Sequence, residues 1–268
     1  MASDAAVKAL IEGLYGVALV TQVSAAALWA YDYFLTLGME IELVWTTKWN
    51  IIKVLFLVQR YLPLIDTCIL TLYRDLMPQT ERNCSRLETT TGFMYVTGYA
   101  IAEILLSLRV WAVWNRSKAL AFLLPIAFIV IWSPAFIFMY YFTLSLKFSP
   151  APPYPGARGC FIIFAKDYVK WCWTSLIIWN TLTLSLMLIP GVRLYQSRLK
   201  SSLTMVVYRD GTFYFVYLFV LSLLNIILSV VLTVSFATAN PRCFALHICY
   251  LSPTKNLFLV RTYSFTYL

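Results

Sequence analysis

The chain has 268 residues, of which 61% are hydrophobic and 12% charged, and its mean hydropathy is +0.75. A soluble domain carries about 25% charged residues, so this composition excludes an ordinary soluble fold. The net charge of +9 comes from Lys and Arg residues that stand mostly between apolar runs. That placement is typical of the flanks of membrane spans and argues against a nucleic-acid-binding face.

Six apolar runs are each long enough to cross the hydrocarbon core, which needs roughly 20 residues. They cover residues 14–37, 51–73, 92–113, 119–146, 171–192 and 211–236. We expect helices, because backbone polar groups in lipid must be satisfied within the segment. The predicted fold is therefore an all-α polytopic transmembrane helix bundle over residues 1–240. Residues 241–268 form either a tail or a degenerate seventh span.

Two cysteines suggest which end of the bundle faces outward. Cys84 falls in the predicted loop after the second span and Cys160 in the loop after the fourth, so both lie on the same side. We expect a disulfide between them, which requires an oxidising compartment; the alternative is two unpaired thiols. The disulfide places the N-terminus outside, in the plasma membrane or a secretory-pathway membrane. The Lys and Arg residues of the loops are too evenly divided to decide the orientation.

Four ionisable residues lie inside the predicted spans, where such residues usually pair or line a cavity. Helix rise places Arg60 and Glu103 at nearly the same depth, with Asp32 within reach of the arginine side chain. We expect a buried Asp32–Arg60–Glu103 cluster in the inner half of the bundle, acting either as a lock between three helices or as a functional switch. Asp66 lies nearer the outer side, where it faces an external ligand cavity or bonds to a neighbouring hydroxyl.

The sixth predicted span carries a polar stripe at helical spacing. Its members are Ser222, Asn225, Ser229 and Thr233. Small polar residues let transmembrane helices approach closely and form hydrogen bonds across the interface. The stripe is interpreted as a packing face, with a ligand or ion path as the alternative.

The first two spans carry a more specific pattern. Its elements are Tyr31-Asp32-Tyr33, Leu35-Thr36, Glu40, Glu42, Trp45, Lys53-Val54-Leu55-Phe56 and Arg60-Tyr61. Within residues 30–74 this pattern resembles a family of basidiomycete fungal multi-pass membrane proteins whose N-terminal domain has no known function. The resemblance implies a seven-helix protein with the N-terminus outside and no established activity. The segment 242–268 departs from the clean seventh helix and basic tail that the resemblance implies.

The functional expectation follows from what the sequence contains and lacks. A single histidine, His247, and no glycine-rich phosphate loop leave no catalytic, metal or cofactor set, so we expect no enzyme. The leading hypothesis is a receptor-like seven-helix protein that contacts the bilayer and a cytoplasmic signalling partner. One alternative is a small transporter or channel that uses the intramembrane charges. Another is a structural membrane protein without a ligand.

Overall fold

The computed structural model describes residues 2–77, 80–149, 159–166 and 168–196, together with the single positions 216, 219, 220, 223, 224 and 227. The sixth predicted span lies outside the described residues except for these single positions. Also outside them are the tail after residue 240 and the polar stripe of Ser222, Asn225, Ser229 and Thr233. The elements in chain order are α1 (Ala2–Glu40), η1 (Ile41–Trp45), α2 (Ile51–Pro63), η2 (Leu64–Thr71), α3 (Leu72–Leu76), α4 (Glu81–Val113), α5 (Lys118–Ser145), β1 (Lys147–Phe148), β2 (Ile162–Phe164) and α6 (Val169–Gln196). The two η elements are π-helical turns.

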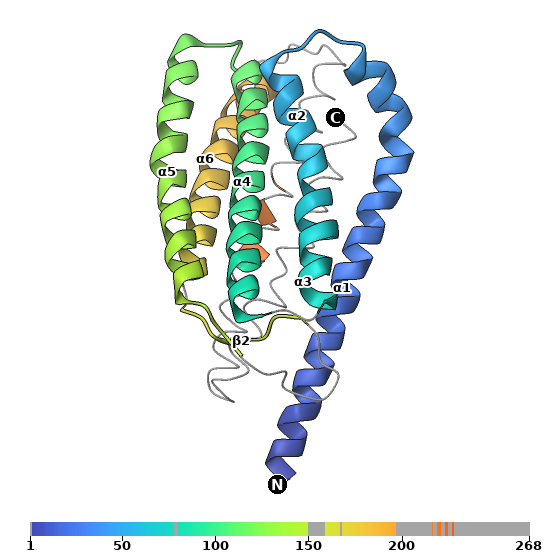
Figure 1. The fold of residues 1–268 in the computed structure, drawn as a ribbon. Helices are drawn as coiled ribbons and strands as arrows, with labels where there is room; N and C mark the ends of the chain where they lie inside the picture. The colour runs from blue at the N-terminus through green and yellow to red at the C-terminus, as the bar shows by residue number, and fades with distance from the viewer. Residues whose placement is uncertain are drawn as a thin grey trace.

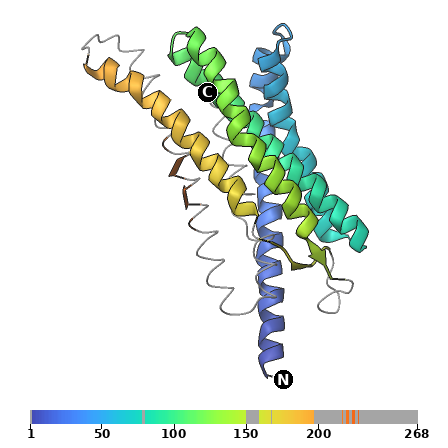
Figure 2. The ribbon, with the colours of Figure 1, turned by 90° about the vertical axis from the view of Figure 1, so that its left-hand side faces the viewer.

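The helices run roughly side by side, and α6 packs behind α4 and α5 (Figure 1; Figure 2). The N-terminus of α1 lies on the same side as the strands β1 and β2, which pair antiparallel. We call this side the hairpin end. The opposite side, the turn end, carries the α1–α2 connection at residues 46–50 and the α4–α5 turn at residues 114–117. The strands β1 and β2 form a short hairpin between α5 and α6.

Within the described residues, four helices are long and apolar enough to cross a membrane: Ile51–Arg74, Glu81–Val113, Lys118–Ser145 and Val169–Pro190. They correspond to the second to fifth predicted spans, although the helix that holds the third predicted span begins at Glu81 rather than at residue 92. The first predicted span lies within α1, which is helical throughout but is not among these four. Such helices suit an integral membrane protein.

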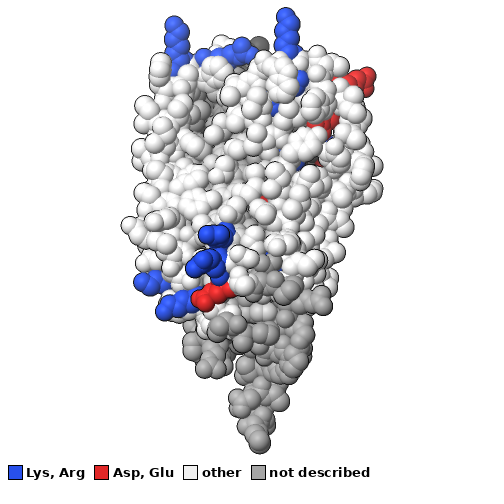
Figure 3. Space-filling model, viewed as in Figure 1, with Lys and Arg blue, Asp and Glu red and all other residues white. Residues whose placement is uncertain are grey.

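The outer surface agrees with this assignment. Charged side chains gather toward the two ends of the face in Figure 3, and the middle is almost entirely uncharged. Large apolar side chains are exposed along α5, including Phe122 at 74% exposure and Val130 at 65%. An apolar surface of this extent is typical of contact with lipid.

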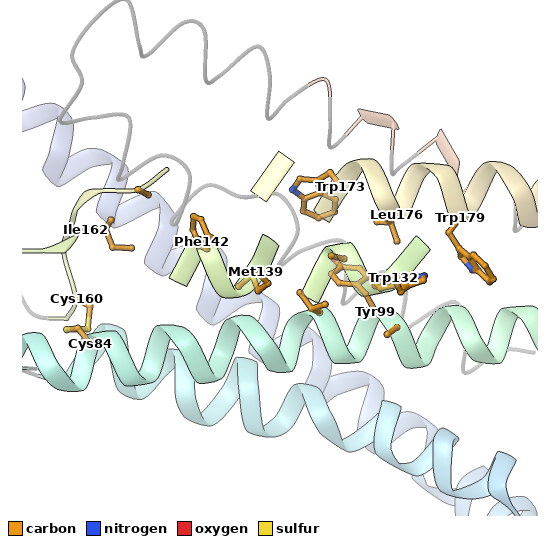
Figure 4. Packing of buried hydrophobic residues seen from close by; sticks show 14 of the residues in the cluster. Cys84, Tyr99, Trp132, Met139, Phe142, Cys160, Ile162, Trp173, Leu176 and Trp179 are labelled. Carbon is orange, nitrogen blue, oxygen red and sulfur yellow. A yellow bond between two sulfur atoms is a disulfide. The ribbon is translucent and has the colours of Figure 1, made fainter. Parts of the chain in front are cut away.

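The main hydrophobic core lies between α4, α5 and α6 and extends to the hairpin (Figure 4). Aromatic rings fill it: Tyr99 meets Trp173 edge to face, and Phe128 stacks on Trp132 and meets Trp179 edge to face. Near the hairpin end the terminal methyl of Met139 on α5 occupies the space beside Gly92 of α4 that a Cβ would take.

The turn end is fixed by two compact features. Asn115 and Arg116 both adopt left-handed backbone conformations, with φ of 50° and 55°, and Ser117 caps the start of α5 through its side-chain oxygen. The indole N–H of Trp114 donates to the carbonyl of Leu186 on α6 at 2.9 Å. Pro190, four residues after Leu186, has no N–H to offer that carbonyl. The Trp114 bond thus satisfies a backbone group that the proline leaves without its helical donor.

Candidate functional site: a buried ion pair between the first two helices

One face of α1 carries polar side chains at four-residue intervals. Asp32, Thr36 and Glu40 follow one another at this spacing, which places them on the same side of a helix. Their exposed fractions are only 4%, 2% and 4%. Such a stripe on an otherwise apolar helix requires polar partners from a neighbouring element.

Helix α2 supplies the cation. The side chain of Asn50 caps its first turn by accepting a hydrogen bond from the backbone N–H of Lys53 at 2.7 Å, and Arg60 follows two turns later with 5% exposure. Arg60 forms a salt bridge through Nε to Oε2 of Glu40, and its Nη2 donates to the hydroxyl of Thr36 at 2.6 Å. The guanidinium also lies over the ring of Tyr33, 5.5 Å from its centroid. Two helices are joined here by a charged group that is almost fully removed from solvent.

The second carboxylate oxygen of Glu40 accepts two further hydrogen bonds. The hydroxyl of Tyr61 donates to Oε1 at 3.0 Å, and the indole N–H of Trp45 donates to the same oxygen at 3.1 Å. Glu40 and Trp45 are five residues apart, and the π-helical turn η1 brings residues at this spacing together. We define the Arg60 cluster as Tyr33, Thr36, Glu40, Trp45, Arg60 and Tyr61.

Lys53 closes the turn end next to this cluster. Its ammonium donates to the carbonyls of Trp45 at 3.3 Å and Thr47 at 2.9 Å. The same nitrogen lies 4.6 Å from the ring centroid of Trp49. These contacts hold the α1–α2 connection over the start of α2.

The predicted cluster of Asp32, Arg60 and Glu103 is placed as follows. All three side chains are buried, with exposed fractions of 4%, 5% and 0%. The carboxylate that pairs with Arg60 in the contacts described above is Glu40, which sequence reasoning did not select. Direct contact of Arg60 with Asp32 or Glu103 stays a prediction. The four-residue spacing from Asp32 through Thr36 to Glu40 was the signal that could have identified Glu40.

Asp66 lies in the π-helical segment η2, which begins directly after Pro63. Its side chain has no exposed surface. The two predicted roles of this side chain, facing an outer cavity or bonding to a neighbouring hydroxyl, stay predictions. Its backbone carbonyl accepts a hydrogen bond from the hydroxyl of Thr71 at 2.7 Å, five residues along the chain. The oxygen of the Tyr95 side chain lies 3.4 Å from the same hydroxyl, which links the segment to α4.

At the hairpin end a disulfide joins Cys84 to Cys160, with the two Cα atoms 5.5 Å apart. Cys84 lies in the first turns of α4, not in a loop as predicted, because that helix begins earlier than its apolar run. Nearby, Arg74 donates to Glu88 at 2.5 Å and links α3 to α4. The disulfide anchors the hairpin to α4, the helix that packs against α2, α5 and α6.

The part of the chain that the structure describes contains no group of three or more His, Cys, Asp and Glu side chains placed to hold a metal ion. The contacts of the Arg60 cluster are charge pairing and hydrogen bonding.

Comparison with curated proteins gives no match to this chain. Residues 20–65, a segment that contains every member of the Arg60 cluster, match the model of a family described as "Family of unknown function (DUF6533)".

Proposed function

We propose that this protein is a receptor-like membrane protein that signals rather than catalyses. The supporting observation is the Glu40–Arg60 ion pair, which is buried at the end of the bundle opposite the disulfide. A buried ion pair is often no more stabilising than apolar residues of the same volume. Its presence between two helices therefore favours a role in selecting one arrangement of those helices over another.

The proposal includes an orientation and a location. The disulfide favours an oxidising environment at the hairpin end, so this end and the N-terminus face outward from a plasma membrane or secretory-pathway membrane. The turn end then faces the cytoplasm, with the basic side chains of Lys48, Arg116 and Lys118 near its surface. Basic residues on this side agree with the positive-inside rule, although the hairpin end carries basic residues as well.

In this arrangement the Arg60 cluster acts as the switch. While Glu40 holds Arg60, the end of α1 is fixed to α2 and the turn η1 is closed over both by Trp45. A ligand that favours a different α1–α2 packing breaks the pair and releases the turn end toward a cytoplasmic signalling partner. A two-state element of this kind shifts only by the difference in ligand affinity between its states.

The test uses the full chain in lipid nanodiscs with purified heterotrimeric G protein and a fluorescent GTP analogue. The Glu40→Gln substitution removes the charge while keeping an oxygen for Tyr61 and Trp45. We expect it to raise nucleotide exchange above that of the unmodified chain. Glu42→Gln is the matched control, since Glu42 is an exposed acid two residues away, and it leaves exchange unchanged. Absence of stimulated exchange by every form of the chain would refute the receptor proposal.

A second candidate, a small transporter, is favoured by η2. Transporters place ion and substrate sites at interrupted membrane helices, and Asp66 is fully buried in a π-helical interruption of the Ile51–Arg74 span. In proteoliposomes, cation or proton flux that disappears on Asp66→Asn and on Glu103→Gln would support this alternative. A chain that neither stimulates exchange nor conducts flux would fit a structural membrane protein.

A further inference from the structure

A continuous set of aromatic rings joins the end of α5 to the start of α6 at the hairpin end. The ring of Phe138 stacks on that of Trp171, 5.5 Å between centroids, and also on that of Tyr168 at 6.5 Å. Tyr168 contacts Tyr141 at 6.1 Å, and Tyr141 contacts Tyr140 at 5.9 Å. Ring pairs at these distances attract one another beyond the area they bury. We call these five residues the aromatic patch.

The aromatic patch is open to the surroundings at the ends of two candidate membrane spans. Tyr140, Tyr141 and Trp171 each expose about half of their surface. Tyr141 lies four residues before the end of α5, and Trp171 lies two residues after the start of α6. Both are therefore within about 6 Å of a span end along the helix axis. Tyr and Trp at this level are typical of the boundary between hydrocarbon and lipid headgroups.

Positive charge is held beside the aromatic patch. The exposed Lys147 of β1 pairs with Phe164 of β2, and two residues further along the backbone N–H of Lys166 donates to the hydroxyl of Ser145 at 3.0 Å. These antiparallel contacts bring the two lysines close together. The ammonium of Lys166, also an exposed residue, lies 5.9 Å from the ring centroid of Tyr168. A single headgroup can thus reach both lysines and the rings.

The charge of the whole segment has the same sign. Residues 146–171 contain four basic residues and one acidic residue, so their net charge is +3. An anionic group is the complement of this charge, and a lysine ammonium binds phosphate as a point charge. A soluble acidic partner would match the lysines but not the rings, which lie level with the ends of the spans. A phospholipid has both parts at the right heights, a phosphate above and acyl chains below.

We propose that the aromatic patch, together with Lys147 and Lys166, binds an anionic phospholipid from the leaflet at the hairpin end. The acyl chains lie against the rings of Phe138 and Trp171, and the phosphate contacts the two ammonium groups. The site does not depend on the receptor function proposed above, nor on which side of the membrane the hairpin end faces.

The probes are two photoreactive lipids, phosphatidylglycerol and phosphatidylcholine, that carry the same diazirine at the same acyl carbon and differ only in the headgroup. The full chain is placed in phosphatidylcholine nanodiscs with increasing mole fractions of one probe, and labelled peptides are identified by mass spectrometry. We expect saturable labelling of residues 138–141 and 168–171 by the phosphatidylglycerol probe, about three- to tenfold above that by the phosphatidylcholine probe. A basic residue at a membrane surface favours anionic lipid by about fivefold, and salt reduces this.

Two pairs of lysine substitutions test the headgroup contact. Lys147→Gln/Lys166→Gln should bring the ratio of the two probes at the aromatic patch close to one. Lys48→Gln/Lys118→Gln is the matched control, because it removes two exposed lysines at the turn end, and it should keep the ratio. All four positions are exposed, so these variants keep the fold.

A third variant tests the rings. Trp171→Ala removes one side of the stack on Phe138 and should lower the labelling of residues 138–141 by both probes. Unchanged labelling of these residues would exclude the rings as the surface for the acyl chains.

Four further results would overturn the proposal. Labelling that rises linearly with mole fraction and is equal for the two probes would mean ordinary solvation by lipid. A probe ratio that survives Lys147→Gln/Lys166→Gln would exclude these lysines as the phosphate contact. An equal loss of the ratio in the turn-end control would show a general effect of net charge. Displacement of the phosphatidylglycerol probe by soluble glycerol 3-phosphate would show a phosphate site that needs no acyl chain.

Discussion

Breaking the buried ion pair gives the clearest measure of what the Arg60 cluster contributes. The side chains of Arg60 and Glu40 are 6% and 2% exposed, so solvent screens their interaction little. Removing one partner of such a pair leaves the other charge buried and costs about 3–5 kcal/mol. In Glu40→Gln the amide oxygen can still accept the bonds from Tyr61 and Trp45. The expected loss of about 3–5 kcal/mol therefore reports mainly the missing charge.

The double-mutant cycle separates the pair from its surroundings. Arg60→Met leaves Glu40 without its cation and should cost a similar amount. The double variant Glu40→Gln/Arg60→Met contains neither charge. Its destabilisation should be smaller than the sum of the single effects by at least about 2 kcal/mol, because each single variant includes the cost of an unpaired charge.

The free energy of unfolding is measured by titrating SDS into mixed micelles of the purified chain. Glu42→Gln provides the control, since an exposed surface substitution changes stability by no more than about 0.5 kcal/mol. Additive effects of Glu40→Gln and Arg60→Met, or a Glu40→Gln effect no larger than that of the control, would show that the pair is not the main contact of Arg60.

Three further predictions concern the two ends of the bundle. Trp114→Phe should cost about 1–3 kcal/mol in the same unfolding assay, because it leaves the Leu186 carbonyl without a donor. In a Pro190→Ala background the cost should fall below about 1 kcal/mol, since a helical N–H replaces the indole. Equal costs in the two backgrounds would contradict this. Reduction of the disulfide should lower stability by about 2–4 kcal/mol, measured as the shift of the unfolding midpoint with and without dithiothreitol; an unchanged midpoint would show that the bridge does not constrain the unfolded chain. Arg116→Gly should stabilise the chain by up to about 1 kcal/mol, because glycine adopts the left-handed backbone conformation without strain. Arg116→Ala retains the strain and should give no gain. Equal effects of the two substitutions would refute a backbone origin.

The positions of the second to fifth helices could be predicted because lipid imposes a simple rule: the backbone must be helical wherever an apolar run is long enough to cross. Their ends were predicted to within two residues except for the start of α4, where polar turns continue the helix before the apolar run begins. For this reason Cys84 was expected in a loop and lies in α4. The strands β1 and β2, which lie between α5 and α6, have only two and three residues and are too short to give a period-two pattern.

The candidate site was predicted in part. Arg60 was recognised from its place within an apolar run, since a buried cation needs a partner. Glu40 was missed because the first run was taken to end at residue 37. The partner of Arg60 lies where α1 continues as a regular helix beyond that point. The π-helical turn that brings Trp45 onto Glu40 was not predicted, because such turns are rare and apolar periodicity does not signal them.

The disulfide has a consequence for how the protein is made. Cys84 is synthesised with the start of α4, whereas Cys160 follows the whole of α5, 76 residues later. The bridge can form only after α5 has folded back along α4, because only then do the two thiols meet at the hairpin end. An α5 that failed to pack antiparallel to α4 would leave Cys160 away from Cys84. The oxidised fraction of newly made chains therefore reports correct pairing of α4 with α5.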